Sequence, residues 1–255
     1  MGKRAVILTG LGVLVVTLLF APAAAAQEEP PDPCQEPPPG AIVGTDGKDV
    51  LVGTPQDDVI VAKDGNDVIH ARGGNDVICG GLGDDLILAG DGDDAVFPDD
   101  LGFFPPGGPP PPGDPEPPAA PGGNDLVLAG DGDDEVLAGP GNDIVHGGSG
   151  IDFLALAQGN DIGLAGSGDD IVIGGFGTDK LFGESGADAL AGGQGSDLVN
   201  GGSGDDTLIG DIPGPPPTGL PPIPDPNPHT DTCIGAAGTD AAHLCERTIA
   251  VESIN

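Results

Sequence analysis

Carboxylates recur along this sequence at a fixed interval. Of the 255 residues, 42 are Asp or Glu and only 7 are Lys or Arg, so the formal net charge is −35. Sixteen aspartates follow one another at nine-residue steps in two runs, and they are Asp49, Asp58, Asp67, Asp76, Asp85, Asp94, Asp125, Asp134, Asp143, Asp152, Asp161, Asp170, Asp179, Asp188, Asp197 and Asp206. Carboxylates are hard oxygen ligands of the kind that Ca²⁺ and Mg²⁺ bind. The spacing therefore indicates a series of equivalent cation sites.

Each of these aspartates stands at the sixth position of a nine-residue unit. Six units fill residues 44–97 and ten fill residues 120–209. The fourth position is Gly in 15 units, with Gln56 as the exception, and the eighth is aliphatic in 15, with Gly163 as the exception. Gly allows the positive φ of a sharp turn, while the last three positions favour a short strand because they are rich in Val, Ile and Leu. Strand side chains alternate, so position eight points to one side and positions seven and nine to the other.

The unit resembles the RTX (hemolysin-type, repeats-in-toxin) calcium-binding nonapeptide, G-G-x-G-x-D-x-U-x, in which U is aliphatic. This resemblance implies an all-β fold, a parallel β-roll solenoid with two repeats in each turn, Pro-rich insertions and position eight in the interior. It also implies that the sixteen aspartates named above are metal ligands. Two departures from the pattern carry expectations: an altered turn at Gln56, and an empty slot in the core at Gly163.

Stacking of the turns explains why a cation is needed. Turns of a solenoid stack at the strand spacing of about 4.8 Å. Two bare carboxylates at that distance repel by roughly 3.5 kcal/mol at an effective dielectric constant of about 20. Ca²⁺ accepts about six to eight oxygen ligands in flexible geometry, whereas Mg²⁺ requires a stricter octahedron. Counting the intervals between turns in two separate blocks gives about 12 Ca²⁺ ions, and we expect the calcium-free chain to be largely unfolded.

The N-terminus has the composition of a targeting signal. Residues 1–26 combine Lys3 and Arg4, an apolar run and a series of alanines that ends at Ala26, which predicts a cleaved secretory signal peptide. A membrane anchor is the alternative, but the apolar run of about 16 residues is shorter than the roughly 20 that span a bilayer. We therefore expect a secreted, extracellular protein with no membrane insertion after signal cleavage.

Other segments depart from the strict repeat. We expect a Pro-rich N-terminal segment with a cap strand at residues 27–43, a Pro-rich insert at 98–119 and a Pro-rich linker at 210–230. A C-terminal cap at 231–255 contains a degenerate repeat that begins at Gly235. Such Pro tracts usually act as spacers, and a ligand for a proline-binding partner is the alternative.

Four cysteines, Cys34, Cys79, Cys233 and Cys245, are the disulfide candidates. An even number in an exported chain favours disulfides, although three connectivities are possible. A zinc site is the alternative, but the cysteines lack C-x₂-C spacing. The arrangement resembles that of secreted actinobacterial RTX-type calcium-binding proteins, which fits the pairs Cys34–Cys79 and Cys233–Cys245.

Composition and motifs narrow the function. A chain this acidic would be repelled by nucleic acid. It contains neither H-E-x-x-H nor G-x-S-x-G, so we expect no enzymatic activity, and an accessory segment of a secreted hydrolase or toxin is a weaker alternative. Positions seven and nine are each apolar in 13 of 16 units. These outward faces suggest self-association or a protein or cell-surface partner. The sequence thus predicts a secreted calcium-binding protein with a structural or interaction role, and an adhesin-like or self-assembling surface protein is the alternative.

Overall fold

The computed structural model describes residues 32–99, 122–211, 232–237, 241–243 and 247–250. The segment predicted to be a signal peptide and most of the Pro-rich insert and of the Pro-rich linker lie outside the described residues. Within the described part of the chain all regular structure is β-strand, and no helix is long and apolar enough to cross a membrane.

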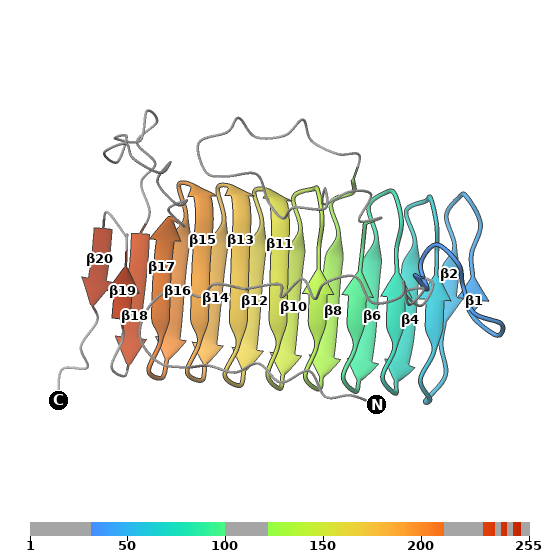
Figure 1. Ribbon diagram of the computed structural model, residues 1–255, viewed down its shortest axis with the longest axis horizontal. Coiled ribbons are helices and arrows are strands. Elements are labelled where there is room, and N and C mark those ends of the chain that lie inside the picture. The colour runs from blue at the N-terminus through green and yellow to red at the C-terminus, as the bar shows by residue number, and fades with distance from the viewer. Residues whose placement is uncertain (1–31, 100–121, 212–231, 238–240, 244–246, 251–255) are drawn as a thin grey trace, which may run out of the picture. The chain divides into compact units, whose positions relative to one another are not determined.

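The described residues form twenty short strands that alternate between two parallel sheets of ten strands each (Figure 1). The first sheet contains the odd-numbered strands β1 (Ile42–Val43), β3 (Val59–Val61), β5 (Val77–Cys79), β7 (Ala95–Phe97), β9 (Glu135–Leu137), β11 (Phe153–Gly159), β13 (Ile171–Gly177), β15 (Ala189–Gly195), β17 (Thr207–Asp211) and β19 (Ala241–His243). The second sheet contains the even-numbered strands β2 (Val50–Val52), β4 (Val68–Gly73), β6 (Leu86–Asp91), β8 (Leu126–Asp131), β10 (Ile144–Ser149), β12 (Ile162–Ser167), β14 (Lys180–Ser185), β16 (Leu198–Ser203), β18 (Thr232–Ala237) and β20 (Arg247–Ala250).

The register of the sheets confirms the predicted β-roll. Residues 18 apart lie side by side in neighbouring strands, as in the pairs Val68↔Leu86 and Ile144↔Ile162. Eighteen residues are two nonapeptides, so each turn of the solenoid contains one unit in each sheet. The fold class predicted from the sequence, an all-β parallel solenoid, is therefore correct.

The solenoid continues without a break across the Pro-rich insert. Leu86 pairs with Leu126 and Ala95 pairs with Glu135, so neighbours here are 40 residues apart and keep the same register. Gly81 N–H donates to the carbonyl oxygen of Pro98 at 2.8 Å, and Pro98 is buried. Pro98 and Asp99 thus occupy positions one and two of the seventh unit, and Gly122 resumes it at position three. The two runs of repeats are one solenoid rather than two separate blocks.

The C-terminal strands extend the same stacking. β18 pairs with β16, with Leu198 beside Thr232 and Val199 beside Cys233. β19 pairs with β17 in the frame of the degenerate repeat, with Leu208 beside Ala242. The sequence analysis did not recognise that β18 begins with the end of a repeat, because only positions six to nine of that unit, residues 231–234, follow the pattern.

Cys34 and Cys79 form one of the expected disulfides, with their Cα atoms 5.7 Å apart. This bond ties the segment before β1 to the end of β5, and it leaves neither thiol for a zinc site. Cys233 is also disulfide-bonded and fully buried, and its partner lies outside the described residues.

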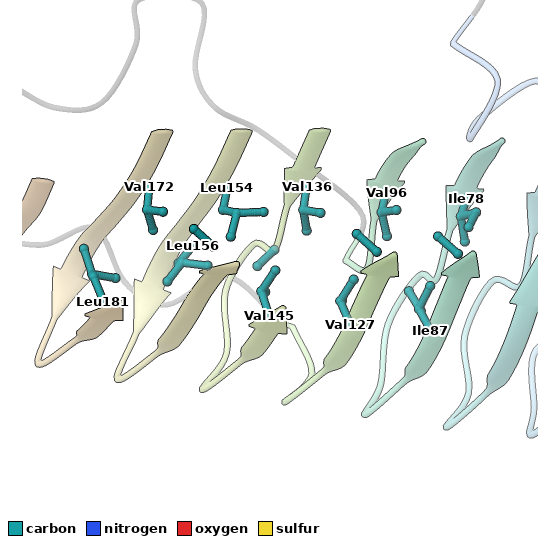
Figure 2. Close-up of a cluster of buried hydrophobic side chains, with 14 of the residues drawn as sticks. Ile78, Ile87, Val96, Val127, Val136, Val145, Leu154, Leu156, Val172 and Leu181 are labelled. Carbon is teal, nitrogen blue, oxygen red and sulfur yellow. The ribbon is translucent and has the colours of Figure 1, made fainter. Parts of the chain in front are cut away.

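Aliphatic side chains from both sheets fill the interior (Figure 2). Position eight supplies most of them, as expected. The first sheet contributes Ile78, Val96, Val136 and Leu154, and they point toward side chains of the second sheet such as Ile87. Position one also points inward, which the sequence analysis missed. The position-one side chains that are fully buried are Ala62, Ala71, Ala89, Ala129, Ala138, Leu156 and Ala165.

The slot that Gly163 was expected to leave empty is occupied. A Cβ added to Gly163 would lie 3.2 Å from Cδ1 of Leu156 and 3.1 Å from Cγ1 of Val172. Leu156 stands at position one of the same unit, where most units carry Gly or Ala. The larger side chain at position one therefore compensates for the missing one at position eight.

Substitution of Leu156 and Gly163, singly and together, tests this compensation. We expect Leu156→Ala to lower the free energy of unfolding of the calcium-saturated protein by about 2–5 kcal/mol, because it leaves a cavity. Gly163→Val alone should cost about 1–3 kcal/mol through crowding against Leu156. The double variant should recover part of the loss, measured by urea denaturation. Strictly additive effects of the two substitutions would contradict the pairing.

Candidate metal centre

The sixteen predicted ligands form two rows, one along each sheet. Each aspartate immediately precedes a strand, so the register of the strands sets the register of the carboxylates. The row before the second sheet contains Asp49, Asp67, Asp85, Asp125, Asp143, Asp161, Asp179 and Asp197. The row before the first sheet contains Asp58, Asp76, Asp94, Asp134, Asp152, Asp170, Asp188 and Asp206.

Hydrogen bonds link the aspartates of a row, each of which is called a rung, to their neighbours in the next turn. The backbone N–H of each aspartate donates to Oδ1 of the aspartate one turn later, for example from Asp67 to Asp85 at 2.8 Å. Fourteen such bonds occur, with donor–acceptor distances of 2.7–3.0 Å. The bond from Asp85 to Asp125, at 2.7 Å, crosses the insert. One oxygen of each later carboxylate is therefore fixed by the backbone.

The second carboxylate oxygen has no such partner in most rungs. Oδ2 is buried and accepts no hydrogen bond in Asp67, Asp76, Asp85, Asp94, Asp125, Asp134, Asp143, Asp152, Asp161, Asp170, Asp179 and Asp188. Each of these side chains is at most 3% exposed. A buried acceptor without a donor costs about 1–3 kcal/mol, and more if it is charged. These twelve oxygens are the clearest sign that a group absent from the polypeptide completes the rows.

Burial also changes the acidity of the rows. It raises the pKa of Asp85 to about 7 and that of Asp161 to about 8, because a charged carboxylate is poorly solvated there. The N–H donated from the preceding rung opposes this rise, and the negative charges of neighbouring rungs add to it. Burial likewise raises the pKa of Asp94 to about 6 in the other row. Without a cation, the fold therefore favours protonated carboxylates.

Backbone carbonyls lie beside the carboxylates at the turns. A Cβ added to Gly65, at position four, would lie 2.7 Å from Oδ1 of Asp67 and 3.0 Å from the carbonyl oxygen of Gly47, one turn earlier. One turn later, a Cβ on Gly83 would overlap the carbonyl oxygen of Gly65. Position four is Gly because carboxylate and carbonyl oxygens of adjacent turns converge where a side chain would otherwise stand.

These donors fit Ca²⁺. Among the described residues no group of three or more His, Cys, Asp or Glu side chains is placed to hold a metal ion. A cation in the rows would therefore take carboxylate oxygens from the aspartates and complete its coordination with backbone carbonyls. Ca²⁺ accepts such a mixed set of hard oxygen ligands in variable geometry, whereas zinc prefers Cys and His.

The first turn is built differently. The N–H of Thr45 donates to Oδ2 of Asp49 at 2.6 Å, and the N–H of Thr54 donates to Oδ2 of Asp58 at the same distance. In later units position two is usually a residue with positive φ, such as Lys63 at 81°. The altered turn expected at Gln56 thus extends to the whole first coil. In this coil the chain itself supplies the hydrogen-bond donor to Oδ2 that the inner rungs lack.

One buried acid near the rows was missed by the sequence analysis. Asp99 is 1% exposed, and burial raises its pKa to about 8. It escaped notice because the nonapeptide frame was resumed at residue 120, which left Asp99 in the insert. The signal in the sequence was that Pro98 and Asp99, followed by Gly122 and Gly123, form one regular unit when the insert between them is left out.

Comparison with known families agrees with this geometry. A family model described as the RTX calcium-binding nonapeptide repeat (4 copies) matches residues 43–78, 73–100, 122–154, 157–190 and 182–212. These matches span more than half of the chain. The chain therefore belongs to the family of RTX calcium-binding nonapeptide repeat proteins, and Ca²⁺ is the partner of its repeats. A comparison with curated proteins found no match.

The raised pKa values predict how the metal-stripped protein responds to pH. The carboxylates that titrate near 3.8 when unfolded have pKa values of about 6–8 in the roll. The metal-free roll therefore binds extra protons, is most stable below pH 4 and loses that stability as the pH rises through 6–8. We expect the stripped protein to gain β-sheet signal in far-UV circular dichroism when the pH is lowered from 8 to about 5.5.

High salt provides the control for this experiment. Salt at about 0.5 M screens the repulsion among exposed carboxylates but acts weakly on buried ones. The gain in sheet on acidification should therefore persist in salt. Equal or greater sheet content at pH 8 would contradict the prediction.

Proposed function

We propose that this chain is an exported calcium-binding protein whose β-roll folds when Ca²⁺ enters the two rows of aspartates. Its role is structural or interactive rather than catalytic. The observation that carries the proposal is the series of twelve buried Oδ2 atoms without hydrogen-bond partners. Metal-dependent folding follows because the sites exist only when successive turns are stacked.

The electrostatics of the rows support folding on calcium. Adjacent carboxylates at the strand spacing of about 4.8 Å repel by roughly 3.5 kcal/mol at an effective dielectric constant of about 20. Summed over a row, this exceeds the total stability of a typical domain, about 5–15 kcal/mol. A divalent cation in each interval converts the repulsion into attraction between turns.

The continuous solenoid changes the number of ions that we propose. The expectation of about 12 ions rested on two separate blocks of repeats. Because Asp85 bonds to Asp125 and Asp94 bonds to Asp134 across the insert, two more intervals are formed. The fourteen rung-to-rung bonds set the upper number of intervals available to Ca²⁺.

Export is supported by the sequence and by one bond. Residues 1–26 have the charge and hydropathy pattern of a secretory signal. The disulfide between Cys34 and Cys79 is typical of proteins that fold in an oxidising compartment. Millimolar calcium outside cells would keep extracellular modules of modest affinity loaded.

Removal of calcium tests the proposed function. At pH 8 the metal-stripped protein should lose most of its β-sheet signal in far-UV circular dichroism. Addition of excess Ca²⁺ should restore the signal, whereas Mg²⁺ at the same concentration should not, because it demands stricter geometry. Full retention of the sheet after complete removal of metal would refute calcium-dependent folding.

The outer face of the second sheet supports self-association as an additional role. Leu126, Leu128 and Ile144 are 38%, 38% and 41% exposed, and the register places Leu126 beside Ile144. Apolar side chains in neighbouring strands form a continuous surface that water solvates poorly. We propose that two calcium-loaded copies associate through this face.

A charged residue at the same strand position tests this association. Lys180 occupies position seven on β14, in register with Ile162, so a lysine is compatible with this place in the sheet. Ile144→Lys should leave the calcium-bound circular dichroism unchanged and should abolish the concentration-dependent rise in molar mass measured by light scattering. A wild-type protein that stays monomeric with calcium at high concentration would refute the proposal.

A further inference from the structure

Asp99 is an acid that the repeat pattern does not account for. It stands at position two of the spliced seventh unit, a position at which no other nonapeptide unit within residues 44–209 carries Asp. Its side chain is only 1% exposed. Burial raises the pKa of its carboxyl group, and the negative charges of Asp125, Asp143 and Asp85, three consecutive rungs of one row, add to this rise. A carboxylate of the insert has thus been buried against the row of repeat carboxylates.

The carboxylate of Asp99 replaces a regular backbone hydrogen bond. In other turns the N–H at position four donates to the carbonyl at position three of the next turn, as from Gly65 to Leu82 at 2.7 Å. The equivalent acceptor for Gly123 is the carbonyl of Pro140. Gly123 N–H instead donates to Asp99, at 3.0 Å to Oδ1 and 3.2 Å to Oδ2. The carbonyl oxygen of Pro140 therefore loses the donor that its equivalents have.

The Pro140 carbonyl oxygen and the Asp99 carboxylate border a space that glycines keep free of side chains. A Cβ added to Gly122 would overlap both the Pro140 carbonyl oxygen and Oδ2 of Asp99. A Cβ added to Gly139, on the following turn, would lie 3.2 Å from the same Oδ2. Two oxygen acceptors that face each other across this space repel unless a proton or a cation stands between them.

The neighbouring rungs add a second and independent observation. Oδ2 of Asp125 and Oδ2 of Asp143 are buried and accept no hydrogen bond, and these side chains are 2% and 1% exposed. The junction therefore offers carboxylates and a backbone carbonyl as ligands. Among the described residues, no group of three or more His, Cys, Asp or Glu side chains is placed to hold a metal ion by itself. That donor set suits a cation that combines carboxylate and carbonyl oxygens.

We infer that Asp99 is a calcium ligand additional to the sixth-position aspartates, and that with Pro140 O and a carboxylate of the adjoining row it forms a cation site at the splice. This inference rests on the proposed binding of calcium by the rows. The ion would hold Pro98–Asp99 against Gly122–Gly123, where the chain enters and leaves the insert. In this unit, position two thereby joins position six in binding the cation.

A protonated Asp99 is the competing explanation. Burial raises the pKa of its carboxyl group to about 8, so that without a cation the group would be neutral and its O–H would donate to Pro140 O. Asparagine reproduces this neutral arrangement, because its amide donates to a carbonyl and its oxygen accepts from Gly123 N–H. Asp99→Asn therefore keeps the hydrogen bonds and removes only the charge.

Native mass spectrometry at saturating Ca²⁺ counts ions on each variant of the full chain. Asp99→Asn and Asp99→Ala should each bind one Ca²⁺ fewer than the wild type, with unchanged far-UV circular dichroism for the asparagine variant. Asp64→Asn is the matched control, because Asp64 is exposed and loses the same charge. It should bind as many ions as the wild type.

Asp143→Asn separates the two possible failures. If the wild type binds no calcium, the proposed function fails and the inference fails with it. If Asp143→Asn loses ions while Asp99→Asn keeps the wild-type number at every calcium concentration, only the inference about Asp99 is overturned. In that case Asp99 is a neutral hydrogen-bonding group at the base of the insert.

Discussion

Like charges stacked at the spacing of β-strands are the constraint on which this structure depends. Backbone pairing places a carboxylate of each turn directly over that of the turn before, and the register leaves no freedom to separate them. The backbone satisfies one oxygen of each carboxylate, while the second stays buried without a donor in twelve rungs. The same pairing that builds the sheets therefore also builds the rows of carboxylates that the calcium-binding repeat supplies.

The sequence predicted those features that repeat within one unit. The sixth-position aspartates and the aliphatic eighth position follow from the spacing of residues such as Asp67 and Ile69, whereas the parallel pairing of alternate units was expected from the family resemblance. Features that arise between turns were not predictable in this way. The inward position of Leu156 becomes visible only when it is seen to fill the space over Gly163. The hydrogen bond from Thr45 to Asp49 depends on a backbone conformation that the pattern does not specify.

The insert shows how little the coil depends on the length of chain between its rungs. Neighbours 40 residues apart across the splice keep the pairing that neighbours 18 residues apart have elsewhere. The chain leaves between positions two and three of a unit, after β7 has ended at Phe97, and the N–H of Gly123 donates to Asp99 in place of the Pro140 carbonyl. Asp99 and Gly123, one on each side of the splice, then close the gap through their own hydrogen bonds.

The threonines of the first turn give the solenoid two unlike ends. All fourteen rung bonds run from the N–H of an earlier turn to the carboxylate of a later one. At the N-terminal end, the N–H groups of Thr45 and Thr54 donate to the Oδ2 atoms, which stay without a donor in the inner rungs. Exposed sheet edges commonly invite polymerisation, and at this edge the polypeptide itself supplies a donor to one oxygen of each terminal carboxylate. The solenoid thus opens with a coil that is held by its own backbone and continues with coils whose carboxylates each keep one oxygen without a donor.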